Sequence, residues 1–467
     1  MKKERDYSRL LAVIEEEYRK RSPKCGELAE RAKHCMVDGV NHTLRFVPPF
    51  PPRITSASGA YVVDEDGHRI LDFWQGHFAN ILGHNPAVVS ESLAGAFQDG
   101  FGLQTGYPDR LQVEAAEILC RRTGCERVRF TTSGSLATMY AILLARAHTG
   151  RERVMKVGGG WHGAHPWGLK GVGFQPPSTV GYQHVDSAGL PPAVTENVVI
   201  TGFNDVEALE RDFRLHGDAL ACFIVEPFIG SGGMMPAAPE YLRAARALSE
   251  RHGAVLVFDE VIAGFRFRAG NAAGLYGIQP DLTTFGKVMG GGMPVAAVGG
   301  RADIMELASR SANVRVSFSG GTYSAHPASL LAAKTMMSYL VENEAEIYPR
   351  IAAMGEKVRR VLEDTFAREG IYAFCTGRGN AAIAGSSLFY LHFPYKEGAR
   401  PDRPEELFDP ALADTVLGEK VVHQAFLLED VHLLHGHGAV STAHGDAEAG
   451  RLEEACRRVA RRIKEYL

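Results

Sequence analysis

Long apolar segments are missing from this 467-residue sequence, and without a run of about 18 apolar residues no transmembrane helix is expected. Charge of one sign is not in excess either, because 51 Lys and Arg are set against 55 Asp and Glu, with no long basic block. A nucleic-acid-binding protein is therefore not expected. Residues 1–21 are rich in Lys, Arg and Glu with apolar residues at helical spacing, which predicts an amphipathic helix and not a signal peptide.

Paired cysteines are also lacking. The seven cysteines are scattered and no Cys-x-x-Cys pair occurs, which favours a reducing compartment and a cytoplasmic location. Glycine is plentiful by contrast, with 51 in 467 residues, or about 11% against a usual share of about 7%. The length predicts two or three compact units.

Short apolar runs alternate with helical patterns over most of the chain. This alternation predicts an α/β fold with a mostly parallel sheet covered by helices on both faces, and ligands bind such sheets at the carboxyl ends of the strands. The expected strands are 127–131, 153–157, 197–200, 221–225, 254–258 and 295–298, and the expected helices between them are 137–147, 206–213 and 241–251.

The two ends of the chain have a different pattern. A hairpin is expected at 60–64 and 69–72 around a turn of Asp and Gly. Long helices are expected at 329–342, 347–369 and 446–467, with a polar surface loop or insertion at 395–410. The predicted domains are an N-terminal segment (1–75), a large α/β domain (76–327) and a smaller α+β domain (328–467).

Lys287 is the only charged residue between positions 282 and 300, a segment with six glycines. A lysine in such surroundings is expected to be partly desolvated, which lowers its pKa and favours the neutral, nucleophilic amine that forms Schiff bases with carbonyls. The alternative is a lysine that simply extends from a loop into solvent.

Asp259 follows an apolar strand, where a carboxylate is well placed to pair with a cationic nitrogen of a ligand. A turn or cap is its alternative role. A third segment, Ser133-Gly134-Ser135, joins a strand to a helix, and backbone N–H groups at such a helix start bind phosphate. Simple N-capping by Ser133 or Ser135 explains the same residues.

Together, a phosphate-binding turn, a strand-end Asp and an isolated lysine predict pyridoxal 5'-phosphate as cofactor. Val-Phe-Asp-Glu-Val (257–261) and Thr-Thr-Phe-Gly-Lys-Val-Met-Gly-Gly-Gly-Met-Pro (283–294) resemble the class III, fold type I aminotransferases. Within that family the sequence is most similar to glutamate-1-semialdehyde aminomutase and its relatives. The likeness runs from about Val37 to the C-terminus and is broken mainly at 395–410.

The resemblance implies roles for individual residues. Lys287 and Asp259 would be catalytic, as Schiff-base lysine with proton shuttle and as partner of the pyridine nitrogen. Arg45 matches the arginine that receives the substrate carboxylate in the aminomutase, although an exposed structural arginine is equally compatible. The implied cofactor-binding residues are Ser133, Gly134, Ser135, Trp161, His162, Ser231, Val261 and Thr322, and the implied substrate residues are Arg45, His77, His435 and His437.

Several of these residues have an alternative interpretation or depart from the family pattern. Trp161 stands where the family usually has a tyrosine stacked on the pyridine ring, and Val261 would pack on the other face. His162 is alternatively a supporting or core histidine, and Glu226, in Val-Glu-Pro, is as compatible with a structural role as with a functional one. Thr322 matches a threonine that reaches the phosphate of the neighbouring subunit, which implies a homodimer with shared sites.

The substrate positions depart from those of the aminomutase. Its pocket tryptophan falls at His77 and its asparagine near the cofactor at Ser231, and its C-terminal glutamate has no counterpart in residues 432–439. The Pro-rich segment 48–52 resembles the β-amino-acid aminotransferases of the family instead.

We therefore expect transfer of an amino group from a small, carboxylate-bearing amino acid or amino ketone to a keto acid. Intramolecular transfer, as in the aminomutase, is the alternative; epimerisation and decarboxylation stay open. A metal-dependent hydrolase using His432, His435, His437 and His444 is a remote alternative, because no His-x-x-x-His pair occurs and no metal ligand set is expected.

Overall fold

The structure is a computed structural model that describes residues 5–175 and 181–467. Its centre is a seven-stranded sheet in which all neighbouring strands run parallel except β12, which is antiparallel to both β4 and β11. In spatial order the strands are β4 (Arg127–Thr131), β12 (Ala296–Gly300), β11 (Leu282–Phe285), β10 (Val255–Glu260), β7 (Leu220–Val225), β5 (Arg153–Val157) and β6 (Val198–Thr201). The mostly parallel α/β architecture expected from the sequence is therefore confirmed.

Helices cover both faces of this sheet. Alternate residues of β7 and β10 belong to different cores: Ile224 and Val257 pack with α6, whereas Phe223 and Leu256 pack with α9. Strands that are apolar on both faces must be covered on both, which explains the continuous apolar runs in the sequence. The covering helices are α6 (Gly134–Thr149) with α11 (Ala302–Met305) on one side and α8 (Val206–His216) with α9 (Pro239–His252) on the other.

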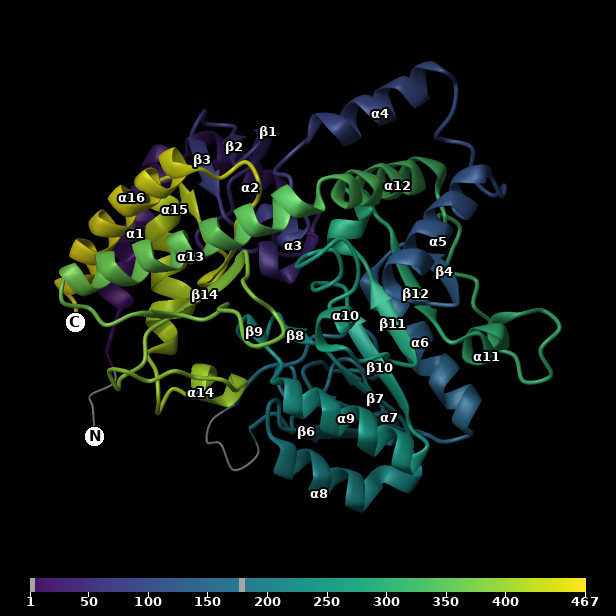
Figure 1. Cartoon of the computed structure of the whole chain (residues 1–467). Helices are drawn as coiled ribbons and strands as arrows, with labels where there is room; N and C mark the ends of the chain where they lie inside the picture. The colour runs from purple at the N-terminus through teal and green to yellow at the C-terminus, as the bar shows by residue number, and fades with distance from the viewer. Residues whose placement is uncertain (1–4, 176–180) are drawn as a thin grey trace.

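A third group of helices packs beside the sheet, at the upper right of Figure 1. Helix α12 (Pro327–Glu342) contacts both α4 (Ala87–Gln98) and α5 (Arg110–Thr123). Asp109 caps α5 by accepting a hydrogen bond from the Gln112 nitrogen, and Gly124 ends the helix in the left-handed conformation. Smaller elements elsewhere in the chain are α7 (Pro192–Thr195), α10 (Ala273–Tyr276), β8 (Phe228–Ile229) and β9 (Met235–Pro236).

The two ends of the chain build a second unit together, with the purple N-terminal and yellow C-terminal segments side by side in Figure 1. A single apolar core contains Leu10, Leu71, Val358 and Leu452. Its sheets are β1 (Ile54–Ser58), β2 (Tyr61–Asp64), β3 (Arg69–Asp72) with β15 (Val431–His432), and β13 (Phe374–Cys375), β14 (Leu388–His392) with β16 (His437–Ala439). Its helices are α1 (Ser8–Arg21), α2 (Pro23–Lys33), α13 (Glu344–Arg368), α15 (Val422–Leu428) and α16 (Asp446–Lys464).

Several predicted elements match within a few residues, including the hairpin β2–β3 and the helices α12, α13 and α16. The N-terminal helix begins at Ser8, and residues 1–4 of that prediction lie outside the described residues. The stretch 395–410 is not simply a loop, because it contains α14 (Pro404–Phe408), whose Leu407 is fully buried against the large core. Across the described ranges, no helix is long and apolar enough to cross a membrane. The domain boundaries at 75 and 327 stay predictions.

Candidate active site

The carboxyl ends of β4, β5, β7, β10 and β11 lie at one edge of the central sheet, because these strands share one direction. A cavity of about 250 Å³ opens there. The structure thus brings together the sequence-predicted residues Ser133, Gly134, Ser135, Trp161, His162, Glu226, Asp259, Val261 and Lys287, all of which line this cavity. We call it the central cavity.

Lys287 directly follows β11 and opens a short 3₁₀ turn, η4 (Lys287–Gly290). Its backbone φ of 47° lies in the left-handed region, which is unfavourable for a residue with a Cβ. Burial lowers the pKa of the Lys287 amine, although Asp259 and Glu226 act in the opposite direction. In the described part of the chain the amine donates no hydrogen bond. A desolvated amine without a partner is poised to react as a nucleophile.

Asp259, at the end of β10, is 4% exposed and held from three sides. Its Oδ1 accepts hydrogen bonds from the Thr284 hydroxyl at 2.9 Å and the Val261 nitrogen at 3.1 Å, and its Oδ2 lies 2.8 Å from His162 Nδ1. Thr284 stands opposite Asp259 in the β10–β11 register. Sequence reasoning quoted Thr284 within a motif but gave it no role, because a strand residue's cross-strand partner is not visible in the sequence.

His162 is buried behind Asp259, with 1% of its surface exposed. Burial lowers the pKa of His162, and the opposing effect of Asp259 does not reverse this. A neutral imidazole that bonds a carboxylate through Nδ1–H keeps Nε2 as a bare acceptor, and Nε2 has no partner among the residues described. His162 therefore fixes the orientation of Asp259 and also contributes to the cavity wall.

The turn after β4 leads directly into the 16-residue helix α6. Ser133 is its N-cap and accepts from the Leu136 nitrogen at 3.3 Å, so the capping alternative is realised for this residue. Ser135 Oγ accepts from the Ala164 nitrogen at 3.3 Å. At Gly134, an added Cβ would lie 2.9 Å from Val261 Cγ1. Capping does not compete with anion binding, since the remaining free N–H groups and the helix dipole still favour a negative charge at this end.

Glu226 follows β7 and connects two loops of the cavity. Its Oε1 accepts from the Trp161 nitrogen at 3.1 Å and its Oε2 from the Gly230 nitrogen at 3.0 Å. Burial and the nearby Asp259 raise the pKa of this carboxyl well above its usual range. Both oxygens of Glu226 bind backbone N–H groups of neighbouring loops, and these contacts support the structural reading.

A second cavity of about 530 Å³, here called the N-terminal cavity, is lined by Arg45 and His77. The segment α3 (Gln75–Phe78) forms its rim and contacts η4, which carries Lys287. All four residues of α3 have positive φ, from 47° to 67°, so this segment is a left-handed turn. Asp72 holds its start by accepting from the Gln75 nitrogen at 2.9 Å, and the Arg266 guanidinium holds its end through the Phe78 carbonyl.

His77 and Arg45 differ in their surroundings. Burial, His42, Lys287 and Arg45 together lower the pKa of His77 to about 3, so its imidazole is neutral. Arg45 lies in a short exposed turn, η2 (Thr43–Arg45), and forms no ion pair in the described ranges. The structure therefore brings both predicted substrate residues to the side of the Lys287 segment.

Four other predicted residues line neither of these cavities. His435 Nδ1 lies 2.9 Å from the Glu419 carbonyl, and His437 Nδ1 lies 3.1 Å from the His435 carbonyl. Ser231 is exposed, and Thr322 lines a separate open cavity of about 820 Å³ beside α5. Their roles stay predictions. His432, which the sequence analysis named among the histidines of the metal alternative, lines the N-terminal cavity.

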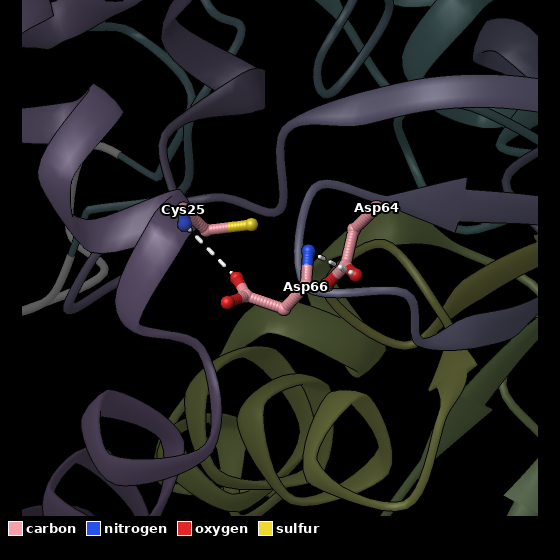
Figure 2. A group of neighbouring side chains, drawn as sticks. All are labelled: Cys25, Asp64 and Asp66. Carbon is pink, nitrogen blue, oxygen red and sulfur yellow. Dashed lines mark hydrogen bonds between the residues drawn. The ribbon is translucent and has the colours of Figure 1, made fainter.

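The C-terminal histidines do not form a metal site in the described residues. The one group of possible ligands found there consists of Cys25, Asp64 and Asp66 (Figure 2). Asp66 accepts from the Lys24 and Cys25 nitrogens, each at 2.9 Å, and so caps α2, while Asp64 accepts from the Asp66 nitrogen at 3.1 Å. These contacts explain the cluster as a helix cap.

The central cavity fits pyridoxal 5'-phosphate. A free amine, a carboxylate fixed by three donors and a glycine-containing helix start are the groups that this cofactor requires for its aldehyde, ring nitrogen and phosphate. Lys287, Asp259 and the turn at Gly134 would hold these three parts.

Comparisons with known proteins agree with this geometry. The sequence model of the family Aminotransferase class-III matches residues 45–382. A glutamate-1-semialdehyde 2,1-aminomutase of Halobacterium salinarum is 36% identical over 356 residues, which cover 75% of this chain and 77% of the relative.

Two solved structures have similar folds over nearly the whole chain. An omega-transaminase from Sphaerobacter thermophilus has a TM-score of 0.84 and 31% identity, covering 95% of this chain and 98% of the other. A β-phenylalanine aminotransferase from Variovorax paradoxus has a TM-score of 0.82 and 28% identity, covering 97% of each chain. The chain therefore belongs to the class III aminotransferases, fold type I enzymes whose cofactor is pyridoxal 5'-phosphate.

Proposed function

We propose that this enzyme moves an amino group between a carboxylate-bearing amino acid or amino ketone and a keto acid, with Lys287 as the reacting lysine. The observation that carries the proposal is the central cavity, where an unpartnered Lys287 amine faces the same space as the fixed carboxylate of Asp259 and the start of α6. Each of these groups alone is explained by a common structural role, but no such role explains why all three line the same cavity.

The bound cofactor supplies an aldehyde that condenses with amines and a ring that accepts electrons when a bond to the neighbouring carbon breaks. Asp259, oriented by Thr284 and His162, would hold a proton on the ring nitrogen. Lys287 Nζ, whose pKa is lowered by burial, takes up and returns a proton at the substrate carbon. Val261 and Trp161 line the cavity and would pack on the two faces of the ring.

The substrate class is supported by the N-terminal cavity. Arg45 offers a guanidinium there that forms no ion pair with the described residues, and guanidinium groups bind carboxylates in a bidentate manner. Lys287 lies close enough to lower the pKa of His77, so a substrate held by Arg45 can present its amine to the central cavity. The similarity to a β-phenylalanine aminotransferase adds a carboxylate-bearing amino acid as a precedent.

Intramolecular amino transfer is the second candidate function. It is favoured by the 36% identical relative, which is a glutamate-1-semialdehyde 2,1-aminomutase. The residues at the substrate positions favour amino transfer to a keto acid, because His77 replaces the pocket tryptophan and Ser231 replaces the asparagine expected of an aminomutase.

We also propose a homodimer with shared sites. Thr322 lines a cavity other than the central one, so it cannot serve the phosphate position of its own chain from there. Around it, Tyr107 is 74% and Tyr323 is 63% exposed, and nearby Leu103 is 75% exposed. Large apolar side chains gathered beside a predicted binding residue favour a surface that a second copy covers.

The deciding experiment supplies candidate amino acids and amino ketones to the holoenzyme with and without a keto acid. Turnover that requires the acceptor supports the aminotransferase, whereas isomerisation without acceptor supports the aminomutase. In parallel, Lys287→Ala is expected to abolish the cofactor adduct that borohydride traps. A trapped adduct in Lys287→Ala would refute the role of Lys287.

A further inference from the structure

The wall of the N-terminal cavity combines residues from the two ends of the chain. Asp72 ends β3 and His432 ends β15, and the two strands pair in parallel with His432 opposite Asp72. Both side chains line the cavity, and both are buried, with 3% and 8% of their surfaces exposed. The left-handed turn that contacts η4 begins three residues after Asp72.

Asp72 is fully engaged within the protein. Its carboxylate accepts from the Trp74 and Gln75 nitrogens, each at 2.9 Å, and lies 2.7 Å from His84 Nε2 and 3.2 Å from His432 Nδ1. Burial alone would raise the pKa of Asp72, but the hydrogen bonds of His432 and His84 outweigh it and hold the pKa below its usual range. Asp72 is therefore an anion whose acceptor positions are already used.

The same wall carries nitrogen atoms that have no partner. His432 Nε2, His77 Nε2 and Trp74 Nε1 are buried and unbonded in the part of the chain that the structure describes. The Trp74 ring lies 4.3 Å from that of His77 and 5.4 Å from that of His432, centroid to centroid. Buried polar atoms without partners are rare in native proteins and call for a ligand or water that satisfies them.

The charges around these atoms favour an anion. Of the described residues that line the N-terminal cavity, Asp72 is the only acidic one, while Arg45 and Arg53 contribute guanidinium groups. A histidine with the Asp72 carboxylate at Nδ1 and a ligand carboxylate at Nε2 donates to both, because each ring nitrogen then carries a hydrogen.

The other titratable groups near His432 do not oppose this assignment. His84 shares Asp72, and His77 is neutral. His423 stacks on His432 at 5.6 Å, and burial lowers the pKa of His423 well below its usual value, so it adds no positive charge. His435 contacts His423 edge-on at 4.7 Å, and burial lowers the pKa of His435 as well.

We propose that His432, oriented by Asp72, is a specificity-determining residue that binds the substrate carboxylate in the N-terminal cavity through Nε2, alongside Arg45. This inference rests on the proposed function and extends it to a substrate class. Leu44, Val47, Pro51 and Pro52 line the same cavity and provide an apolar wall. The substrate class is an amino acid that carries an apolar substituent such as a phenyl ring.

The test compares substrates with and without the carboxylate. With pyruvate as acceptor, kcat/KM is measured for 3-amino-3-phenylpropanoate and for 1-phenylethylamine, and the ratio of the two values reports carboxylate recognition. His432→Asn keeps an amide where Nδ1 meets Asp72 but removes Nε2, whereas His432→Gln places an amide near Nε2. His392→Gln is the matched control, because His392 is also buried, at 2% exposed, and lines neither cavity.

His432→Asn is expected to lower the ratio about tenfold or more, the effect of losing one charge-assisted hydrogen bond, with 1-phenylethylamine turnover retained. His432→Gln is expected to keep a larger part of the ratio, and His392→Gln all of it. A ratio in His432→Asn equal to that of the control overturns the proposal.

Calorimetry on the wild-type holoenzyme provides a measurement independent of turnover and of variant folding. The affinity for 3-phenylpropanoate is expected to exceed that for 3-phenylpropanol at least about tenfold. Equal affinities refute carboxylate recognition even when both substrates react. Absence of acceptor-dependent turnover with a retained preference for the carboxylate would instead refute only the proposed function.

Discussion

The hydrogen bond between Thr284 and Asp259 allows a sharp test of the central cavity. Thr284→Val replaces a fully buried hydroxyl with a methyl group of similar shape, so the change removes one 2.9 Å hydrogen bond to a carboxylate without opening a large void. Bonds to charged groups contribute about 1.5–3 kcal/mol, and the lost donor leaves Asp259 Oδ1 with the Val261 nitrogen alone. We expect the apoenzyme to lose that amount of unfolding free energy and the cofactor to dissociate more readily.

The assay is urea unfolding of the apoenzyme together with titration of pyridoxal phosphate into it, followed by absorbance. Thr283→Val is the matched control, since Thr283 is the adjacent residue of β11, is 1% exposed, and points to the other face of the sheet. Equal losses of stability and cofactor affinity in the two variants would refute the role of Thr284 in orienting Asp259.

Two further predictions concern Glu226 and the dimer. Because the folded state raises the pKa of Glu226 above its usual value of 4.5, the folded protein holds this proton while the unfolded chain releases it, so the apoenzyme should lose stability as pH rises from about 4.5 into the neutral range. Glu226→Gln should remove that slope, and an unchanged slope in urea titrations at several pH values would contradict it. For the dimer, sedimentation should give twice the 50.8 kDa chain mass, and mixing inactive Lys287→Ala with weakened Thr322→Val should restore some activity; an active monomer would refute shared sites.

The residues that sequence analysis placed in the central cavity share one property: each stands at or just after the end of a strand. In a parallel sheet, strand ends converge at one edge, so Ser133, Asp259 and Lys287 could be expected together although up to 154 residues separate them. Local patterns of apolar residues were sufficient to predict these cavity residues, because each strand is a short apolar run followed by a turn or a helix.

Other features depended on contacts that no local pattern encodes. The reversed direction of β12 leaves no trace in its residues, because a buried strand is apolar in either orientation. The pairing of Asp72 with His432 joins positions 360 residues apart. The left-handed turn at Gln75–Phe78 contains a single glycine, so its own composition does not predict its conformation. Hydrogen bonds with Asp72 and Arg266 at the two ends of the turn stabilise it instead.

The pairing of β3 with β15 also has a consequence for biosynthesis. At roughly 5–20 residues per second, a ribosome needs roughly 20–70 s to proceed from Asp72 to His432, which stands 360 positions later. Throughout that interval the apolar faces of α1 and β3 have not yet met the C-terminal helices α15 and α16 that complete their core. The unit that joins the two ends of the chain is therefore expected to complete its core only after the central sheet has been synthesised.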